Sequence, residues 1–276
     1  MSDFNRQVIH SLHWWTDTLF SLTCSRSAAF EFESGQFVRI RSAKYNQRLS
    51  GRYGIVSPSD CNELEFLCTR TPTEGHKRRL EHLVPEDEVL VDVHASGTLT
   101  LDALLPGHTL WLIASGAGIA PFMSVIRDPD VYRRFERVVL VHTCRRVREL
   151  AYRDDIMTVL PTLPDIGDFV RRQLIYYPTV TREPFPNSGR VTALIRSGAL
   201  FTRLRLDPFS SSCDRIMMCG NPAMLREAGE LLDSKGFVQG HTFKPGHFVM
   251  SDASGYEPLL SHFPAVKPSS FQKECM

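Results

Sequence analysis

The chain contains 276 residues, of which 42% are hydrophobic and 23% are charged, close to the averages of globular proteins. This composition excludes a disordered or low-complexity chain, and the length predicts about two domains. The net charge of +1 argues against a nucleic acid or an anionic membrane as the main partner.

The first hundred residues have the pattern of short strands. Apolar and polar residues alternate in part, and clusters of Gly, Pro, Asn and Asp separate the segments. Such regular spacing is typical of an antiparallel barrel or sandwich. The expected strands cover residues 19–23, 36–41, 64–69 and 88–93.

Beyond the turn signal Pro106-Gly107, continuous apolar strands alternate with helical segments. This alternation predicts a parallel, doubly wound sheet. The expected strands cover residues 109–114, 138–142, 174–177 and 215–219, and the expected helices cover residues 120–127, 149–160, 191–203 and 222–235.

Cysteine usage and the N-terminus predict a cytoplasmic protein. The seven cysteines show neither C-x-x-C nor zinc spacing, so we expect free thiols and no metal site. Residues 1–15 lack the basic and apolar regions of a signal peptide. Residues 109–126 are uncharged and as long as a membrane span, but their glycines and Pro121 favour a strand, a loop and a helix. We therefore expect no membrane contact.

A glycine-rich loop, Ser115-Gly-Ala-Gly-Ile-Ala-Pro121, follows the first apolar strand and opens a helix. Glycines let a backbone approach a diphosphate, and a helix N-terminus favours its negative charge. Pro121 stands where the third glycine of G-x-G-x-x-G would be. By itself the loop is consistent with either a nucleotide site or a plain tight turn.

Five motifs follow one another along the chain: Gly116-Ala-Gly-Ile-Ala-Pro-Phe122, His142-Thr-Cys-Arg-Arg146, Tyr176-Tyr-Pro-Thr-Val-Thr-Arg182, Gly189-Arg190 and Cys219-Gly-Asn-Pro222. With them, the chain resembles the bacterial ferredoxin/flavodoxin–NADP(+) reductase family from about residue 7 to residue 256. The resemblance implies an N-terminal antiparallel six-stranded flavin barrel followed by a doubly wound parallel-sheet nucleotide-binding domain. We expect a FAD-type barrel over residues 1–104, an NADP-binding domain over residues 105–255 and a C-terminal extension over residues 256–276.

The nucleotide half keeps the residues that the resemblance assigns to NADP(H). Arginine forks suit the adenosine 2′-phosphate, and the acidic residue typical of NAD sites is absent. Cys219 is implied to lie near the nicotinamide, although a buried structural cysteine is the alternative. The residues implied for NADP(H) are Ser115, Gly116, Gly118, Arg145, Arg182, Arg190 and Gly220.

The flavin half departs from the family pattern Arg-x-Tyr-Ser. The chain has Gly51-Arg52-Tyr53-Gly54-Ile55, which keeps the aromatic residue that would stack on the flavin, and Tyr53 is implied to be catalytic together with Cys219. Gly51 replaces the arginine, and Gly54 lacks the hydroxyl. A one-residue shift turns Arg52 to the other face of a strand. The residues implied for FAD here are Arg52, Tyr53, Gly54 and Ile55.

Two further departures concern a phosphate loop and the C-terminus. Lys77 and Arg78 replace Thr and Ser of the family, and with Arg79 they either clamp a diphosphate or form a solvated basic turn. Ser254 stands where the family has an aromatic residue that covers the flavin site. The tail that follows either replaces this cover or is a flexible or partner-binding extension.

Two functions follow from these observations. The first is an NADPH-dependent flavoprotein that exchanges electrons with a ferredoxin or flavodoxin through FAD, as a monomer. The second is a reductase-like protein that has lost FAD and acts as an NADP(H)-binding or other-ligand-binding regulatory or docking module. Flavin content distinguishes the two.

Overall fold

The computed structural model describes residues 4–44, 51–70, 80–241 and 243–253. Its N-terminal part is a sheet of six antiparallel strands in the order β4-β3-β6-β1-β2-β5. A bridge between Ile55 and Phe66 brings the two edge strands together, so the sheet nearly closes into a barrel. The strands are β1 (Phe4–Trp14), β2 (Leu19–Ser25), β3 (Phe37–Ser42), β4 (Gly51–Gly54), β5 (Glu63–Thr69) and β6 (Glu88–Asp92).

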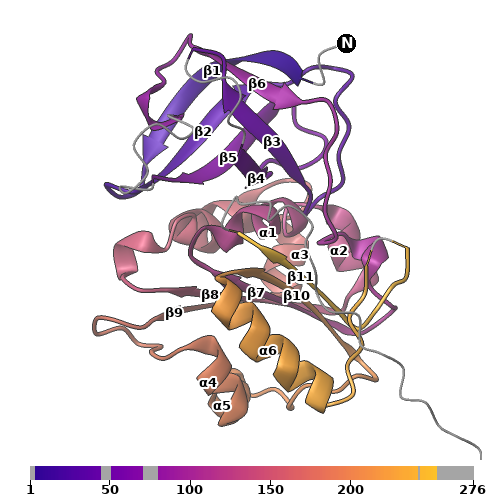
Figure 1. The fold of residues 1–276 in the computed structure, drawn as a ribbon. Helices are drawn as coiled ribbons and strands as arrows, with labels where there is room; N and C mark the ends of the chain where they lie inside the picture. The colour runs from indigo at the N-terminus through magenta and orange to yellow at the C-terminus, as the bar shows by residue number, and fades with distance from the viewer. Residues whose placement is uncertain (1–3, 45–50, 71–79, 242, 254–276) are drawn as a thin grey trace, which may run out of the picture.

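The C-terminal part is a sheet of five parallel strands in the order β11-β10-β7-β8-β9, with helices on both faces (Figure 1). The prediction of an antiparallel six-stranded barrel followed by a doubly wound parallel sheet is confirmed. The strands are β7 (Thr109–Ser115), β8 (Arg137–Cys144), β9 (Leu174–Val180), β10 (Asp214–Gly220) and β11 (Phe248–Asp252). The α-helices are α1 (Ala120–Val125), α2 (Pro129–Arg134), α3 (Gly167–Gln173), α4 (Val191–Arg196), α5 (Ala199–Leu204) and α6 (Pro222–Ser234).

Short helical turns connect these elements. The turns that matter for the site are η3, directly after β7, and η4, directly after β8. They are η1 (Leu80–His82), η2 (Leu101–Ala103), η3 (Gly116–Ile119), η4 (Val147–Glu149), the π-helical turn η5 (Asp155–Val159) and η6 (Leu160–Thr162).

The barrel rests on the face of the parallel sheet that carries α1, α2 and α3, and α4, α5 and α6 cover the opposite face (Figure 1). Side chains of β2 alternate between the two faces of the strand, and this alternation explains how the barrel contacts the parallel sheet. Leu19 belongs to the core shared with the parallel sheet, whereas Phe20 and Leu22 fill the barrel. Both faces of β2 are thus buried, which places the ends of β2 and β5 against the nucleotide half.

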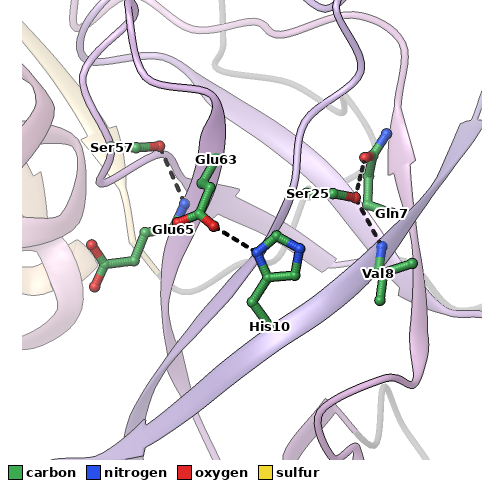
Figure 2. Close-up of polar contacts among 7 residues, drawn as sticks. All are labelled: Gln7, Val8, His10, Ser25, Ser57, Glu63 and Glu65. Atoms are coloured by element: carbon green, nitrogen blue, oxygen red, sulfur yellow. Dashed lines mark hydrogen bonds and ion pairs between the residues drawn. The ribbon is translucent and has the colours of Figure 1, made fainter.

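Polar side chains connect three neighbouring strands of the barrel and the loop after β4 (Figure 2). The Ser25 hydroxyl donates to Gln7 Oε1 at 2.7 Å, and His10 Nδ1 lies 2.7 Å from Glu63 Oε1. The Ser57 hydroxyl accepts from the Glu65 N–H at 3.2 Å. This last contact anchors the chain directly after β4, the strand that carries the implied flavin residues.

Two expected helices are wrong in extent, and three strands were not anticipated. The single helix expected at residues 149–160 is broken by Tyr152, whose φ is +62°, and the segment forms η4, η5 and η6 instead. The helix expected at residues 191–203 divides at Gly198, whose φ is +78°. Neither β1, β4 nor β11 was expected from the pattern of the sequence.

Contacts with the barrel hold Tyr152 in this rarely occupied backbone region. Its hydroxyl donates to Glu65 Oε1 of β5 at 2.8 Å, and Trp15 packs on its ring with centroids 4.8 Å apart. Burial is the main cause that raises the pKa of Glu65, and the hydrogen bond from Tyr152 partly opposes this rise. One tyrosine therefore joins the two halves of the molecule.

We expect Tyr152→Phe to destabilise the protein by about 1–3 kcal/mol, because it removes the hydroxyl that donates to the half-buried Glu65 carboxyl group. Chemical denaturation measures the loss. The control is a double-mutant cycle with Glu65→Gln, in which the hydroxyl should contribute less to stability than it does beside the carboxylate. Equal effects of Tyr152→Phe in both backgrounds would contradict the contact.

Candidate functional site

A cavity of roughly 870 Å³ lies at the carboxyl ends of the parallel strands, where open α/β sheets bind their ligands. The ends of β2 and β5 supply the wall on the barrel side. The lining residues are Thr18, Leu19, Thr69, Arg70, Ser115, Gly116, Ala117, Thr143, Cys144, Arg145, Glu149, Thr181, Arg182, Arg190, Val191, Thr192, Gly220, Asn221, Pro222, Ala223, Met224, Glu227, Asp252 and Ala253.

The glycine loop crosses the end of β10 at very short range. A Cβ on Gly118 would lie 2.3 Å from the Cys219 carbonyl oxygen, and a Cβ on Gly220 would lie 2.0 Å from Ser115 Oγ. Ser115 Oγ also accepts from the Asn221 N–H at 2.8 Å. Gly118 is therefore required by this close approach and does not line the cavity, whereas Gly116 does, with open space where a Cβ would stand.

Three of the arginines expected from the sequence line the same cavity. The Arg182 N–H donates to the Arg145 carbonyl oxygen at 2.9 Å, which brings the loops after β8 and β9 together. Arg190 stands directly before α4. Three arginine residues from three segments thus line one cavity, a composition that suits a phosphate.

Sequence reasoning missed further lining residues. Arg70 follows β5 and is a cation that the barrel contributes to the cavity, and its position directly after an expected strand was the available signal. Glu227 accepts from the Thr192 hydroxyl at 2.9 Å and pairs with Arg196 at 2.9 Å. These contacts lower the pKa of Glu227, and the hydrogen bond from Thr192 has the largest effect. No sequence pattern indicated Glu227.

Cys219 does not line the cavity. Its side chain is fully buried in the core between β10 and the glycine loop, and this burial raises the pKa of the thiol above its usual range. A neutral, buried thiol is no nucleophile. The backbone of Cys219 instead supports Gly118.

The implied flavin residues lie at the seam between β4 and the nucleotide half. The Arg52 guanidinium stacks over Phe37 with its carbon 4.0 Å from the ring centroid, and Nη1 donates to the Ser251 hydroxyl of β11 at 3.1 Å. Arg52 thus reaches across the seam. Tyr53 is half-buried beside the barrel core, to which Ile55 contributes a fully buried side chain.

Neighbouring atoms lie very close to the two glycines of this segment, Gly51 and Gly54. A Cβ on Gly54 would lie 2.7 Å from Pro121 Cδ of α1, and a Cβ on Gly51 would lie 2.7 Å from Tyr53 Cε2. At both glycines the segment therefore has no room for a side chain unless its neighbours move. Lys77, Arg78, Arg79, Ser254 and the extension 256–276 lie outside the described residues.

The residues present fit a dinucleotide phosphate, because an open glycine backbone and three arginines face one cavity. They also fit FAD through the aromatic Tyr53 and the backbone of β4, with no hydroxyl at residue 54. Within the described ranges, no group of three or more His, Cys, Asp or Glu residues is placed to hold a metal ion. No helix in that part of the chain is long and apolar enough to cross a bilayer.

Comparisons with known proteins agree with this geometry. Residues 112–230 match the model of the oxidoreductase NAD-binding domain. Ferredoxin–NADP reductase A of Sorangium cellulosum is 41% identical over 265 residues, 95% of each chain. Ferredoxin–NADP reductase of Pseudomonas aeruginosa is 44% identical over 254 residues, which is 92% of this chain and 98% of the relative.

A solved structure supports the likeness in fold. The ferredoxin NADP+ reductase from Neisseria gonorrhoeae, with bound FAD and NADP, superposes with a TM-score of 0.82 at 24% identity. The match covers 92% of this chain and 100% of that one. At this identity the match concerns the arrangement of barrel and parallel sheet.

We expect Gly54→Ser to lower the free energy of unfolding by about 1–3 kcal/mol, because its side chain would overlap Pro121. Chemical denaturation of the purified variant measures the change. Gly229→Ala in α6 is the control, since its Cβ would meet Met250 Cε at an ordinary 3.7 Å. A Gly54→Ser variant as stable as the parent protein would refute the close approach.

Proposed function

The chain belongs to the ferredoxin–NADP reductase family, and we propose that it exchanges electrons between NADP(H) and a ferredoxin or flavodoxin through FAD. The observation that carries the proposal is the cavity that Gly116 shares with Arg145, Arg182 and Arg190 beside the barrel.

The nucleotide half holds NADP(H) in this proposal. The backbone at Ser115 and Gly116 receives the diphosphate, because both line the cavity where β7 ends and Gly116 presents open backbone. Arg145, Arg182 and Arg190 receive the 2′-phosphate and select NADPH over NADH. Gly220 lets the ends of β7 and β10 come together, which shapes the nicotinamide end of the cavity.

The seam between the halves orients the two cofactors. FAD supplies the conversion of a two-electron hydride into single electrons when it is bound. Tyr53 offers an aromatic face to it, and Gly54 at the end of β4 and Ile55 directly after it offer backbone groups. Arg52 holds the barrel to β11 through Ser251 and so keeps the seam closed. Cys219 is buried behind this region and supports the glycine loop through its backbone, which packs against Gly118.

The proposal includes the organisation of the chain. Residues 1–104 are the flavin part, residues 105–255 are the nucleotide part, and residues 256–276 extend beyond both. Lys77, Arg78 and Arg79 contribute cations for the FAD diphosphate. The protein works in the cytoplasm as a monomer and meets its ferredoxin or flavodoxin transiently.

A second candidate is a reductase-like protein that binds NADP(H) or another ligand without FAD and acts as a docking or regulatory module. The packing at Gly54 favours it, because Pro121 approaches the position at which the family has a serine side chain.

Flavin content decides between the two. We expect the purified protein, after FAD addition and desalting, to retain one flavin per chain and to lose its visible absorption when NADPH is added without oxygen. Spectrophotometry measures both, with NADH as the control. A colourless protein that takes up no FAD but binds NADP+ would overturn the reductase and support the module.

We expect Arg182→Ala to raise the KM for NADPH about tenfold or more, because a hydrogen bond between charged groups contributes about 1.5–3 kcal/mol. The KM for NADH should change little, since NADH lacks the 2′-phosphate. Arg137→Ala, at the opposite end of β8, is the matched control. Equal effects on both cofactors would refute a 2′-phosphate role for Arg182.

A further inference from the structure

His142 is a fully buried residue near the end of β8, directly beneath the glycine loop. It does not line the cavity. Three polar groups surround its imidazole: the Gly116 carbonyl oxygen at 3.1 Å, the Tyr176 hydroxyl at 3.3 Å and Cys144 Sγ at 3.3 Å. No step of the proposed electron transfer uses this histidine.

The partners determine which ring nitrogen carries the proton. A carbonyl oxygen only accepts, so Nε2 carries the hydrogen and donates to Gly116. Burial lowers the pKa of His142 to about 4, which keeps the imidazole neutral and leaves Nδ1 bare. The Tyr176 hydroxyl therefore donates to Nδ1. All of these roles are mutually consistent in one neutral tautomer.

The hydrogen-bond chain continues to the loop after β8. Cys144 Sγ shares the single Nε2 hydrogen with the Gly116 carbonyl oxygen as a second acceptor, while its thiol donates to the Glu149 carbonyl oxygen at 3.3 Å. Burial raises the pKa of Cys144 to about 12, so the thiol keeps its hydrogen. The Glu149 carboxylate in turn accepts from the backbone N–H groups of Arg145 at 3.0 Å and Arg146 at 3.4 Å.

The two ends of this chain are functional loops. Gly116 belongs to the glycine loop, and Arg145 belongs to the loop that follows β8, and both line the cavity. The strands that precede them, β7 and β8, are neighbours in register, with Ser115 opposite Thr143. The imidazole thus lies between the two loops. It contacts the glycine loop directly and the loop after β8 through Cys144 and Glu149.

We propose that His142 is a positioning residue that couples the two phosphate-binding loops of the NADP(H) site. This inference rests on the function proposed above and goes beyond it, because it assigns a shared support to two subsites. Binding of a phosphate group by either loop should favour binding by the other, since both depend on the same buried imidazole.

Peptide geometry explains how the imidazole acts on the glycine loop. The Gly116 carbonyl and the Ala117 N–H belong to one planar trans peptide and point in opposite directions. Because His142 holds the carbonyl on its own side, the N–H of Ala117 points away from it. Gly116 and Ala117 both line the cavity, and this N–H is a donor for the diphosphate there.

The test uses His142→Leu, which removes both nitrogens, and His142→Gln, whose amide nitrogen takes the place of Nε2. Calorimetry measures the dissociation constants of NADP+, which spans both loops, and of adenosine 2′-monophosphate, which offers a phosphate only to the arginine loop. Leu140→Ala is the matched control, a fully buried residue on the same strand that makes packing contacts alone. Tyr176→Phe tests the contact at Nδ1 should His142→Leu fail to fold.

We expect His142→Leu to weaken NADP+ binding about tenfold and binding of adenosine 2′-monophosphate about threefold, as expected for loss of one buried hydrogen bond and its coupling. His142→Gln should restore most of both affinities. The KM for NADPH should rise in the Leu variant while kcat stays within about twofold, because the histidine touches no reacting atom. Tyr176→Phe should weaken NADP+ binding about threefold.

Three results would overturn the inference. Unchanged affinities in His142→Leu or Tyr176→Phe would show that the imidazole does not position the loops. If Leu140→Ala lowered both affinities as much as His142→Leu does, the effect of His142 would be one of general protein stability. Weaker NADP+ binding with unchanged binding of adenosine 2′-monophosphate would refute the coupling. A parent protein that binds neither ligand would instead refute the proposed function.

Discussion

The close crossing of the glycine loop over the end of β10 is the constraint on which the cavity depends. Gly118 packs against the Cys219 carbonyl, and Gly220 packs against Ser115, at distances that exclude any side chain. This crossing brings the first and fourth strand ends of the parallel sheet together. The loops after β8 and β9 then complete a concave surface, and the arginines on them face one common space.

The barrel completes this site because it is packed on the sheet through β2 and β5. Leu19 and Leu67 belong to the same core as the residues of β7 and α1, and Tyr152 adds a hydrogen bond to Glu65 across the seam. Arg52 adds a second polar tie, to Ser251. The seam is thus held at several points, which suits a reaction whose two cofactors must meet between the halves.

The segment of residues 51–54, which was expected to depart from the family pattern, is closely packed in the structure. The glycine at residue 54 is matched by the close approach of Pro121, and Gly51 is matched by the ring of Tyr53. The Arg52 guanidinium stacks over Phe37 and donates to the Ser251 hydroxyl, so this side chain takes part in the packing of the seam. The segment is thus closely packed with glycine at both positions.

The sequence by itself determined the order of the two halves, the glycine loop and the arginines at the strand ends, because each is a local pattern of a few residues. Only the tertiary structure decided the breaking of the helix at Tyr152, the inclusion of Arg70 in the cavity, the path of Arg52 and the partners of His142. Each of these depends on contacts with residues distant in the chain, and such contacts override local propensity.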